Sequence, residues 1–175
     1  GSTIFIIEIA QKRLTDPRLW HAPWLVAGQH AAMAGLATSG TLTHWFRDQF
    51  ARDLPKETAF ATLTAEANAT PPGANGLICL PYFSGERTPI HDTQAKGMVF
   101  GLNLTHKRGD IYRALFEGIA FGTRHVFDTY EDVGHPPRAI LAAGGGTKKS
   151  NYAEGVVEGM LEAGYKGAGE LVSWE

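Results

Sequence analysis

Three consecutive glycines join an apolar, strand-like segment to a helix-like segment near the end of this 175-residue chain. The stretch reads Leu141-Ala142-Ala143-Gly144-Gly145-Gly146-Thr147-Lys148-Lys149-Ser150-Asn151. Because glycine has no Cβ and tolerates positive φ, such backbone can approach a phosphate or a base directly. A helix N-terminus after the turn offers free N–H groups and a partial positive charge. Taken alone, a glycine triplet more often marks a tight turn than a ligand site, so the rest of the chain has to decide.

The composition describes one globular domain. Hydrophobic residues make up 43% of the chain and charged residues 19%, and the net charge of −2 gives no sign of a nucleic-acid or anionic-membrane partner. The single cysteine, Cys79, excludes an intramolecular disulfide and predicts a reducing compartment. Its apolar neighbours favour a small buried residue over a catalytic thiol. No apolar stretch has the length of a membrane span and no signal peptide opens the chain, so we expect a cytoplasmic protein.

Hydrophobic periodicity predicts an α/β order of strands and helices. The expected strands cover 3–10, 31–38, 77–82 and 138–143, with 19–26 as a loop or an edge strand. The expected helices cover 41–50, 58–67, 109–130 and 151–163, and 84–92 is a polar loop. In the longest helix Asp110 supplies an N-terminal charge, whereas Ala114, Gly118 and Gly122 form a smooth ridge. The two glycines cost about 1 kcal/mol each in helix propensity, so we expect close packing against the ridge.

Several segments together resemble the C-terminal domain of the FGGY family of carbohydrate kinases. Gly97-Met98-Val99-Phe100-Gly101-Leu102, followed after seven residues by Asp110-Ile111-Tyr112-Arg113-Ala114-Leu115-Phe116-Glu117, is similar to the family's C-terminal signature. Residues 85–92 resemble the loop before that signature in the pentulose-kinase branch. Residues 39–48 resemble a helix start of the family, and 143–147 resemble its adenosine motif. The resemblance moves the interpretation of the glycine triplet towards a nucleotide site.

The resemblance implies an actin-like, ribonuclease-H-like ATPase fold, truncated at its C-terminal end. Such kinases phosphorylate sugars and polyols with ATP in a cleft between two domains. Residues 1–175 would be the C-terminal nucleotide-binding domain, while the sugar-binding N-terminal domain, with the aspartate base, would be absent. We therefore expect no catalytic residue here and no turnover by this chain alone. The chain has no initiator Met and enters a strand at once, so we expect a fragment of a longer protein.

The nucleotide-binding residues implied by the resemblance form three groups: a phosphate-binding turn, a helix start at the ribose and adenine side, and the adenosine motif. They are Gly1, Ser2 and Thr3; Gly40 and His44; and Gly144, Gly145, Gly146 and Thr147, with Ser150 or Asn151 near the adenine. Structural alternatives stay open. Gly1-Ser2 can be a cloning remnant, Gly40 a helix N-cap and His44 a surface residue. Glu86 and Arg87 either shape the active-site mouth or anchor their loop through an ion pair.

The histidines of the chain show no metal-ligand spacing within one element, so we expect no metal site and Mg²⁺ only as the companion of ATP. The expected partners are a sugar, ATP and the N-terminal domain of the same enzyme; a homodimer stays open, and neither nucleic acid nor a membrane is expected. The 84–92 loop favours xylulose- or ribulose-type sugars over glycerol.

The alternative function is a non-catalytic scaffold or regulatory module with the same fold, which nucleotide titration would distinguish. Two other nucleotide-binding classes fail on the residues. Lys148 stands where the P-loop motif requires glycine, and Lys149 stands at the last glycine of the dinucleotide motif.

Overall fold

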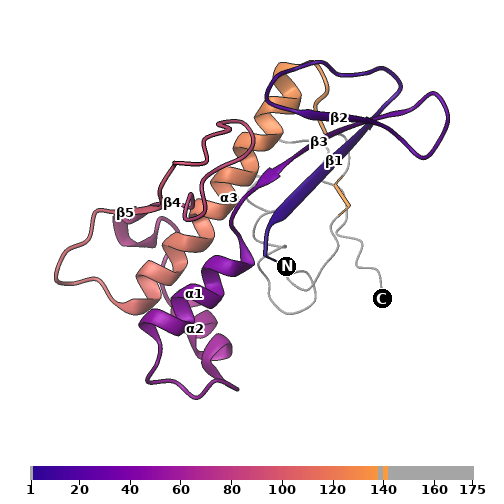
Figure 1. Ribbon diagram of the computed structural model, residues 1–175. Helices are drawn as coiled ribbons and strands as arrows, with labels where there is room; N and C mark the ends of the chain where they lie inside the picture. Colours follow the sequence, from indigo (N-terminus) through magenta and orange to yellow (C-terminus); the bar gives the residue numbers. More distant parts are fainter. Residues whose placement is uncertain (1, 138–139, 142–175) are drawn as a thin grey trace.

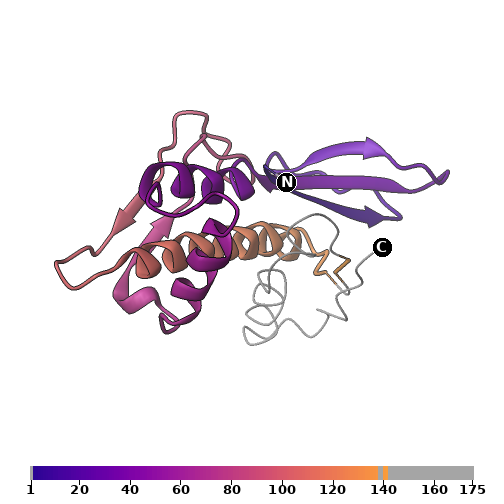
Figure 2. The same cartoon turned by 90° about the horizontal axis from the view of Figure 1, so that it is seen from below.

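The computed structural model describes residues 2–137 and 140–141. Its elements in chain order are β1 (Ile4–Ala10), β2 (Trp20–Pro23), β3 (His30–Leu36), α1 (Gly40–Phe50), α2 (Ala59–Asn68), the 3-10 turn η1 (Ala74–Gly76), β4 (Ile78–Leu80), β5 (Met98–Phe100) and α3 (Arg108–Asp132). The long helix α3 forms the axis of the molecule (Figure 1). The three-stranded sheet lies beside one end of it, and α1, α2 and the β4–β5 pair lie towards the other (Figure 2).

Most predicted elements within the described part are confirmed, with ends shifted by a few residues. The segment 19–26 contains the short edge strand β2, one of the two alternatives. The strand β5 was not predicted from the sequence, because its three residues are ordered by pairing with β4 and carry no periodicity of their own. The predicted helix 151–163 lies outside the described residues. So does the predicted strand 138–143, apart from Ile140 and Leu141, which are not in a strand.

The larger sheet is antiparallel, with strand order β1-β3-β2. Side chains alternate along β1 as the strand period requires. Ile4 and Ile6 pack against the hydrophobic core, whereas Phe5, Ile7 and Ile9 are 53%, 40% and 43% exposed. Among the described residues, the sheet therefore packs against the core through the face that carries Ile4 and Ile6.

One stripe of α3 supplies the centre of the core. Its buried members include Tyr112, Leu115, Ile119, Val126 and Tyr130. This buried stripe agrees with the helix expected over 109–130. None of the helices in the described part is both long and apolar enough to cross a membrane.

The predicted close approach to α3 is confirmed at Gly118. A Cβ built on this glycine would lie 2.5 Å from the backbone oxygen of Cys79 in β4, so only glycine allows the two backbones to touch here. Cys79 is buried, as predicted, and burial raises the pKa of its thiol to about 12. The thiol stays protonated and inert at neutral pH.

Asp110 holds the N-terminus of α3 in place. Its carboxylate accepts hydrogen bonds from the Lys107 N–H (2.7 Å), the Thr70 hydroxyl (2.9 Å) and the Asn75 side-chain amide (3.0 Å). The Lys107 backbone bond contributes most to lowering the pKa of this carboxyl. The predicted helix-terminal charge is thus confirmed, and it also joins α3 to the segment between α2 and β4.

Candidate functional site

The start of β1 and the start of α1 lie next to each other. The Ser2 carbonyl accepts a hydrogen bond from the Thr41 hydroxyl (2.7 Å), one from the Ser39 N–H (3.1 Å) and a long one from the Thr41 N–H (3.5 Å). The strand register explains this meeting. Ile4 pairs with Leu36, so β3 ends beside the start of β1, and α1 follows at Gly40.

The N-terminus of α1 has an unpaired backbone donor among the described residues. The N-cap is Ser39, so the interpretation of Gly40 as the cap is wrong; Gly40 is the first helical residue. Ser39 makes no side-chain capping bond, and the Gly40 N–H has no acceptor in the described part of the chain. Free N–H groups at a helix start carry partial positive charge. Gly40 itself adds no side chain that would cover this backbone.

His44 lies one turn further along α1, on the same face as Gly40. Its side chain is exposed, and its ring meets the Phe60 ring of α2 edge to face, with centroids 5.0 Å apart. Phe60 also lies beneath the Arg47 guanidinium, 4.8 Å from its ring centroid. Contact with Phe60 therefore orients His44 while its outer side stays open to solvent.

The loop 84–92 reaches this region through Glu86, which is only 4% exposed. One carboxylate oxygen accepts the Arg87 N–H (2.6 Å) and the Ala37 N–H (3.0 Å). Of the two alternatives for Glu86 and Arg87, Glu86 does anchor the loop, but through backbone N–H groups and not through an ion pair with Arg87, whose guanidinium lies 5.9 Å from the Trp20 ring centroid. Burial is the main cause that raises the pKa of Glu86.

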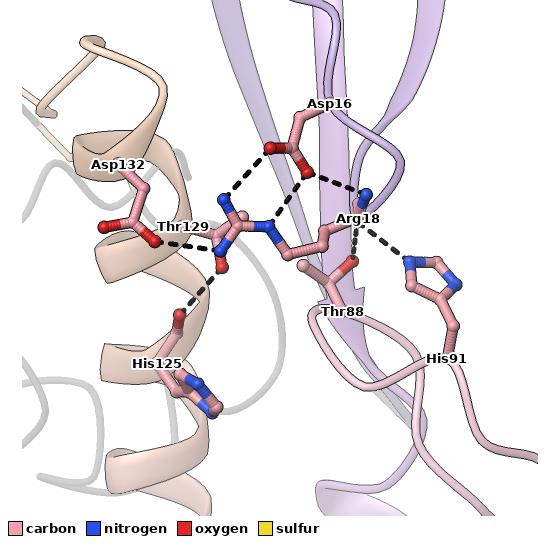
Figure 3. A network of polar contacts seen from close by, with 7 residues as sticks. All are labelled: Asp16, Arg18, Thr88, His91, His125, Thr129 and Asp132. Atoms are coloured by element: carbon pink, nitrogen blue, oxygen red, sulfur yellow. Dashed lines mark hydrogen bonds and ion pairs between the residues drawn. The ribbon is translucent and has the colours of Figure 1, made fainter.

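Arg18 fixes the other side of the same loop (Figure 3). Its carbonyl accepts hydrogen bonds from the Thr88 hydroxyl (3.1 Å) and from a His91 ring nitrogen (2.9 Å). Its guanidinium pairs with Asp16 (2.9 Å) and with Asp132 at the end of α3 (2.8 Å). Sequence analysis missed Arg18, because its partners in α3 and the loop lie 114 and 70 residues away.

The structure thus places Ser2 against Ser39 and Thr41, the two residues that flank Gly40, with His44 one turn further along α1 and Thr3 next to Ser2 in the chain. The remaining candidate residues, which are Gly1, Gly144, Gly145, Gly146, Thr147, Ser150 and Asn151, lie outside the described residues. Within 2–137 and 140–141, no three histidine, cysteine, aspartate or glutamate side chains gather closely enough to hold a metal ion.

This arrangement is that of a partial domain with the actin-like ATPase fold. The structure of xylulose kinase from Rhodospirillum rubrum matches it with a TM-score of 0.79 and 37% sequence identity, covering 87% of this chain and 30% of that chain. Residues 1–154 match the C-terminal domain of the FGGY family of carbohydrate kinases. The chain belongs to this family.

Two curated relatives show how much of such a protein the chain represents. Xylulose kinase from Bacillus subtilis (strain 168) is 34% identical over 116 residues, which cover 66% of this chain and 22% of the relative. Gluconokinase from Bacillus licheniformis is 29% identical over 171 residues, which cover 93% of this chain and 33% of the relative. The chain therefore spans between a fifth and a third of the length of these relatives.

Proposed function

We propose that this chain is the nucleotide-binding part of an ATP-dependent kinase that phosphorylates a pentulose or a related sugar. One observation carries the proposal: the Ser2 carbonyl, by holding Ser39 and Thr41, fixes the start of β1 against the start of α1. Two backbone segments that the family resemblance assigns to nucleotide contact thereby lie next to each other, which supports a common ligand.

The residues at this junction fit a nucleotide. Ser2 and Thr3 would take the phosphates, and Gly40 and His44 the ribose and adenine side. The Gly40 N–H group, which has no acceptor among the described residues, and the positive end of α1 favour an anionic ligand. ATP, with Mg²⁺, supplies the phosphoryl group for transfer. The chain's part is to hold the nucleotide in line with an acceptor bound elsewhere.

The family resemblance implies that the base for the sugar hydroxyl comes from the N-terminal domain. The carboxylates closest to the signature are in keeping with this, because both have structural roles. Asp110 caps α3 and ties it to Thr70. Asp92 accepts the Gln94 N–H (2.7 Å) within its loop, and its carbonyl accepts the Glu86 N–H (2.8 Å). We expect nucleotide binding by this chain, and no sugar phosphorylation until the N-terminal domain is supplied.

Isothermal titration with ADP and Mg²⁺ tests the nucleotide site. We expect weak binding by the native chain, and a loss of affinity of about tenfold, or about 1.4 kcal/mol, in His44→Ala. Gln49→Ala, an exposed change on the same helix, is the matched control and should bind as the native chain does. Absence of any heat with ADP and ATP would favour the scaffold alternative. Turnover of a pentulose by the isolated chain in a coupled kinase assay would contradict the proposed division of labour.

A further inference from the structure

Glu86 connects two segments that have separate roles. Through one oxygen it holds Ala37, which lies just after β3 and three residues before Gly40. Through the same oxygen it holds Arg87, in the loop 84–92. A second link runs alongside, since the Thr88 N–H donates to the Gly35 carbonyl (3.3 Å). The loop is therefore attached to the segment that leads into α1.

This connection costs stability. The second oxygen of Glu86 is buried and has no hydrogen-bond partner among the described residues, and the same holds for the Thr38 hydroxyl next to Ala37. An unpartnered buried acceptor is unfavourable by about 1–3 kcal/mol, and more when it is charged. An apolar side chain would avoid this cost but would leave the Ala37 and Arg87 N–H groups without their acceptor, so the role of the carboxylate is to position these two backbone groups.

The far side of the loop is fixed as well. The Arg18 carbonyl accepts hydrogen bonds from Thr88 and His91, and the Arg18 guanidinium forms an ion pair with Asp132 of α3 (Figure 3). Because Arg18 holds the loop on that side, the hydrogen bond from Ala37 to the Glu86 carboxylate fixes Ala37 relative to the loop. The start of α1, three residues further on, is thereby fixed as well.

We propose that Glu86 is a positioning residue, which fixes the segment 37–39 and with it the N-terminus of α1 relative to the loop 84–92. Nucleotide affinity then depends on a residue that does not contact the nucleotide. The part of this inference that concerns affinity rests on the proposed function; the part that concerns the position of α1 does not.

Three variants test the inference. Glu86→Ala removes the acceptor, whereas Glu86→Gln retains one oxygen for Ala37 and Arg87. Asp110→Asn is the matched control. It removes the charge of another buried carboxylate, which lies at the start of α3 and also accepts hydrogen bonds from backbone and side-chain donors. Should Glu86→Ala fail to fold, Glu86→Asp, which retracts the carboxylate by one methylene, replaces it.

The first readout is ADP affinity by isothermal titration, with the free energy of unfolding measured in urea. We expect Glu86→Ala to weaken ADP binding about tenfold, Glu86→Gln to stay within about twofold of the native chain, and Asp110→Asn to lose stability but no affinity. Native-like affinity in Glu86→Ala would overturn the inference. Equal weakening by Asp110→Asn would also overturn it, because general destabilisation would then explain the effect.

The second readout is amide hydrogen exchange without nucleotide. Exchange at residues 37–41 should rise about tenfold in Glu86→Ala and remain native-like in Glu86→Gln. If the native chain binds no ADP, the proposed function fails, while this readout still decides whether Glu86 fixes the start of α1. Unchanged exchange in Glu86→Ala would overturn the inference on its own.

Discussion

Both ends of α3 carry polar contacts, but in the described structure the N-terminal part is also packed directly against other backbones. Towards its N-terminus, glycines bring other backbones directly onto the helix: a Cβ on Gly109 would lie 2.7 Å from the Glu66 carbonyl oxygen, and one on Gly118 2.5 Å from that of Cys79. Towards its C-terminus, polar side chains tie the sheet to the helix. The Tyr130 hydroxyl donates to the Ala32 carbonyl (3.0 Å), and Arg18 pairs with Asp132.

This difference predicts how each region responds to change. Backbone-to-backbone contact leaves no volume for an added atom, so a small substitution is costly there. Hydrogen bonds and ion pairs can be removed one at a time, and each removal lowers the free energy of unfolding only by the modest contribution of that single interaction. The sheet is also open on the side that exposes Phe5, Ile7 and Ile9, whereas the other region encloses Tyr112 and Leu115.

The largest effect is expected for Gly118→Ala. The new methyl group meets the backbone of Cys79 and cannot be accommodated by a side-chain movement. We expect a loss of about 2 kcal/mol in the free energy of unfolding, measured in urea, despite a gain of about 1 kcal/mol in helix propensity. Gly122→Ala is the matched control, because its Cβ would lie 3.3 Å from the movable methyl groups of Leu36 and should change stability by less than about 1 kcal/mol. Equal losses in the two variants would contradict the backbone-contact explanation.

Asp110→Asn should destabilise the same region by about 2 kcal/mol at neutral pH, because it removes charge-assisted hydrogen bonds. Since the folded-state pKa of Asp110 is lowered, its stabilisation is present above the pKa of the unfolded chain and is lost as the pH falls through the folded value. Urea denaturation should therefore show that the free energy of unfolding differs between the native chain and the variant at pH 7, and that this difference is smaller at pH 3.

The control for this pH dependence is Glu131→Gln, which changes an exposed carboxylate on α3. Its free energy of unfolding should stay close to that of the native chain at both pH values. A difference for Asp110→Asn that stays constant between pH 7 and pH 3 would show that the carboxylate charge is not the source of the stabilisation.

Tyr130→Phe tests the polar attachment of the sheet. Removing the hydroxyl deletes the bond to the Ala32 carbonyl while the buried ring is retained, so we expect a loss of about 1 kcal/mol. Hydrogen exchange should rise in β1 and β3 and remain unchanged in α2. Tyr82→Phe, at a hydroxyl that makes no hydrogen bond to the described residues, serves as the control. Faster exchange in α2 as well would mean that the two regions do not respond separately.

The smallest effect is expected for Asp132→Asn. Asp132 is 60% exposed, and Arg18 keeps Asp16 as a partner, so the loss should stay below about 0.5 kcal/mol. Salt should screen this difference, and it should vanish in 1 M NaCl. A loss as large as that of Tyr130→Phe, measured in the same urea titration, would place Arg18 among the principal supports of the sheet.

The sequence was sufficient where the signal is local. The length and period of α3, its Asp110 terminus and the ridge at Gly118 can all be read within a few turns of one helix. It was insufficient for β5, for the N-cap at Ser39 and for the contacts of Arg18. These depend on pairing partners, on the backbone angles of one residue, or on contacts across 70 to 114 residues.

By itself, the sequence determined the order of the longer elements and the membership in a family of carbohydrate kinases, because helix period and a signature segment can be recognised in consecutive residues. Only the tertiary structure decided that Ser2 meets Thr41, 39 residues away, and that Glu86 holds Ala37, 49 residues away. The reason is geometric. The antiparallel register of β1 and β3 sets where α1 begins, and the fold of the whole chain sets which buried carboxylate reaches it.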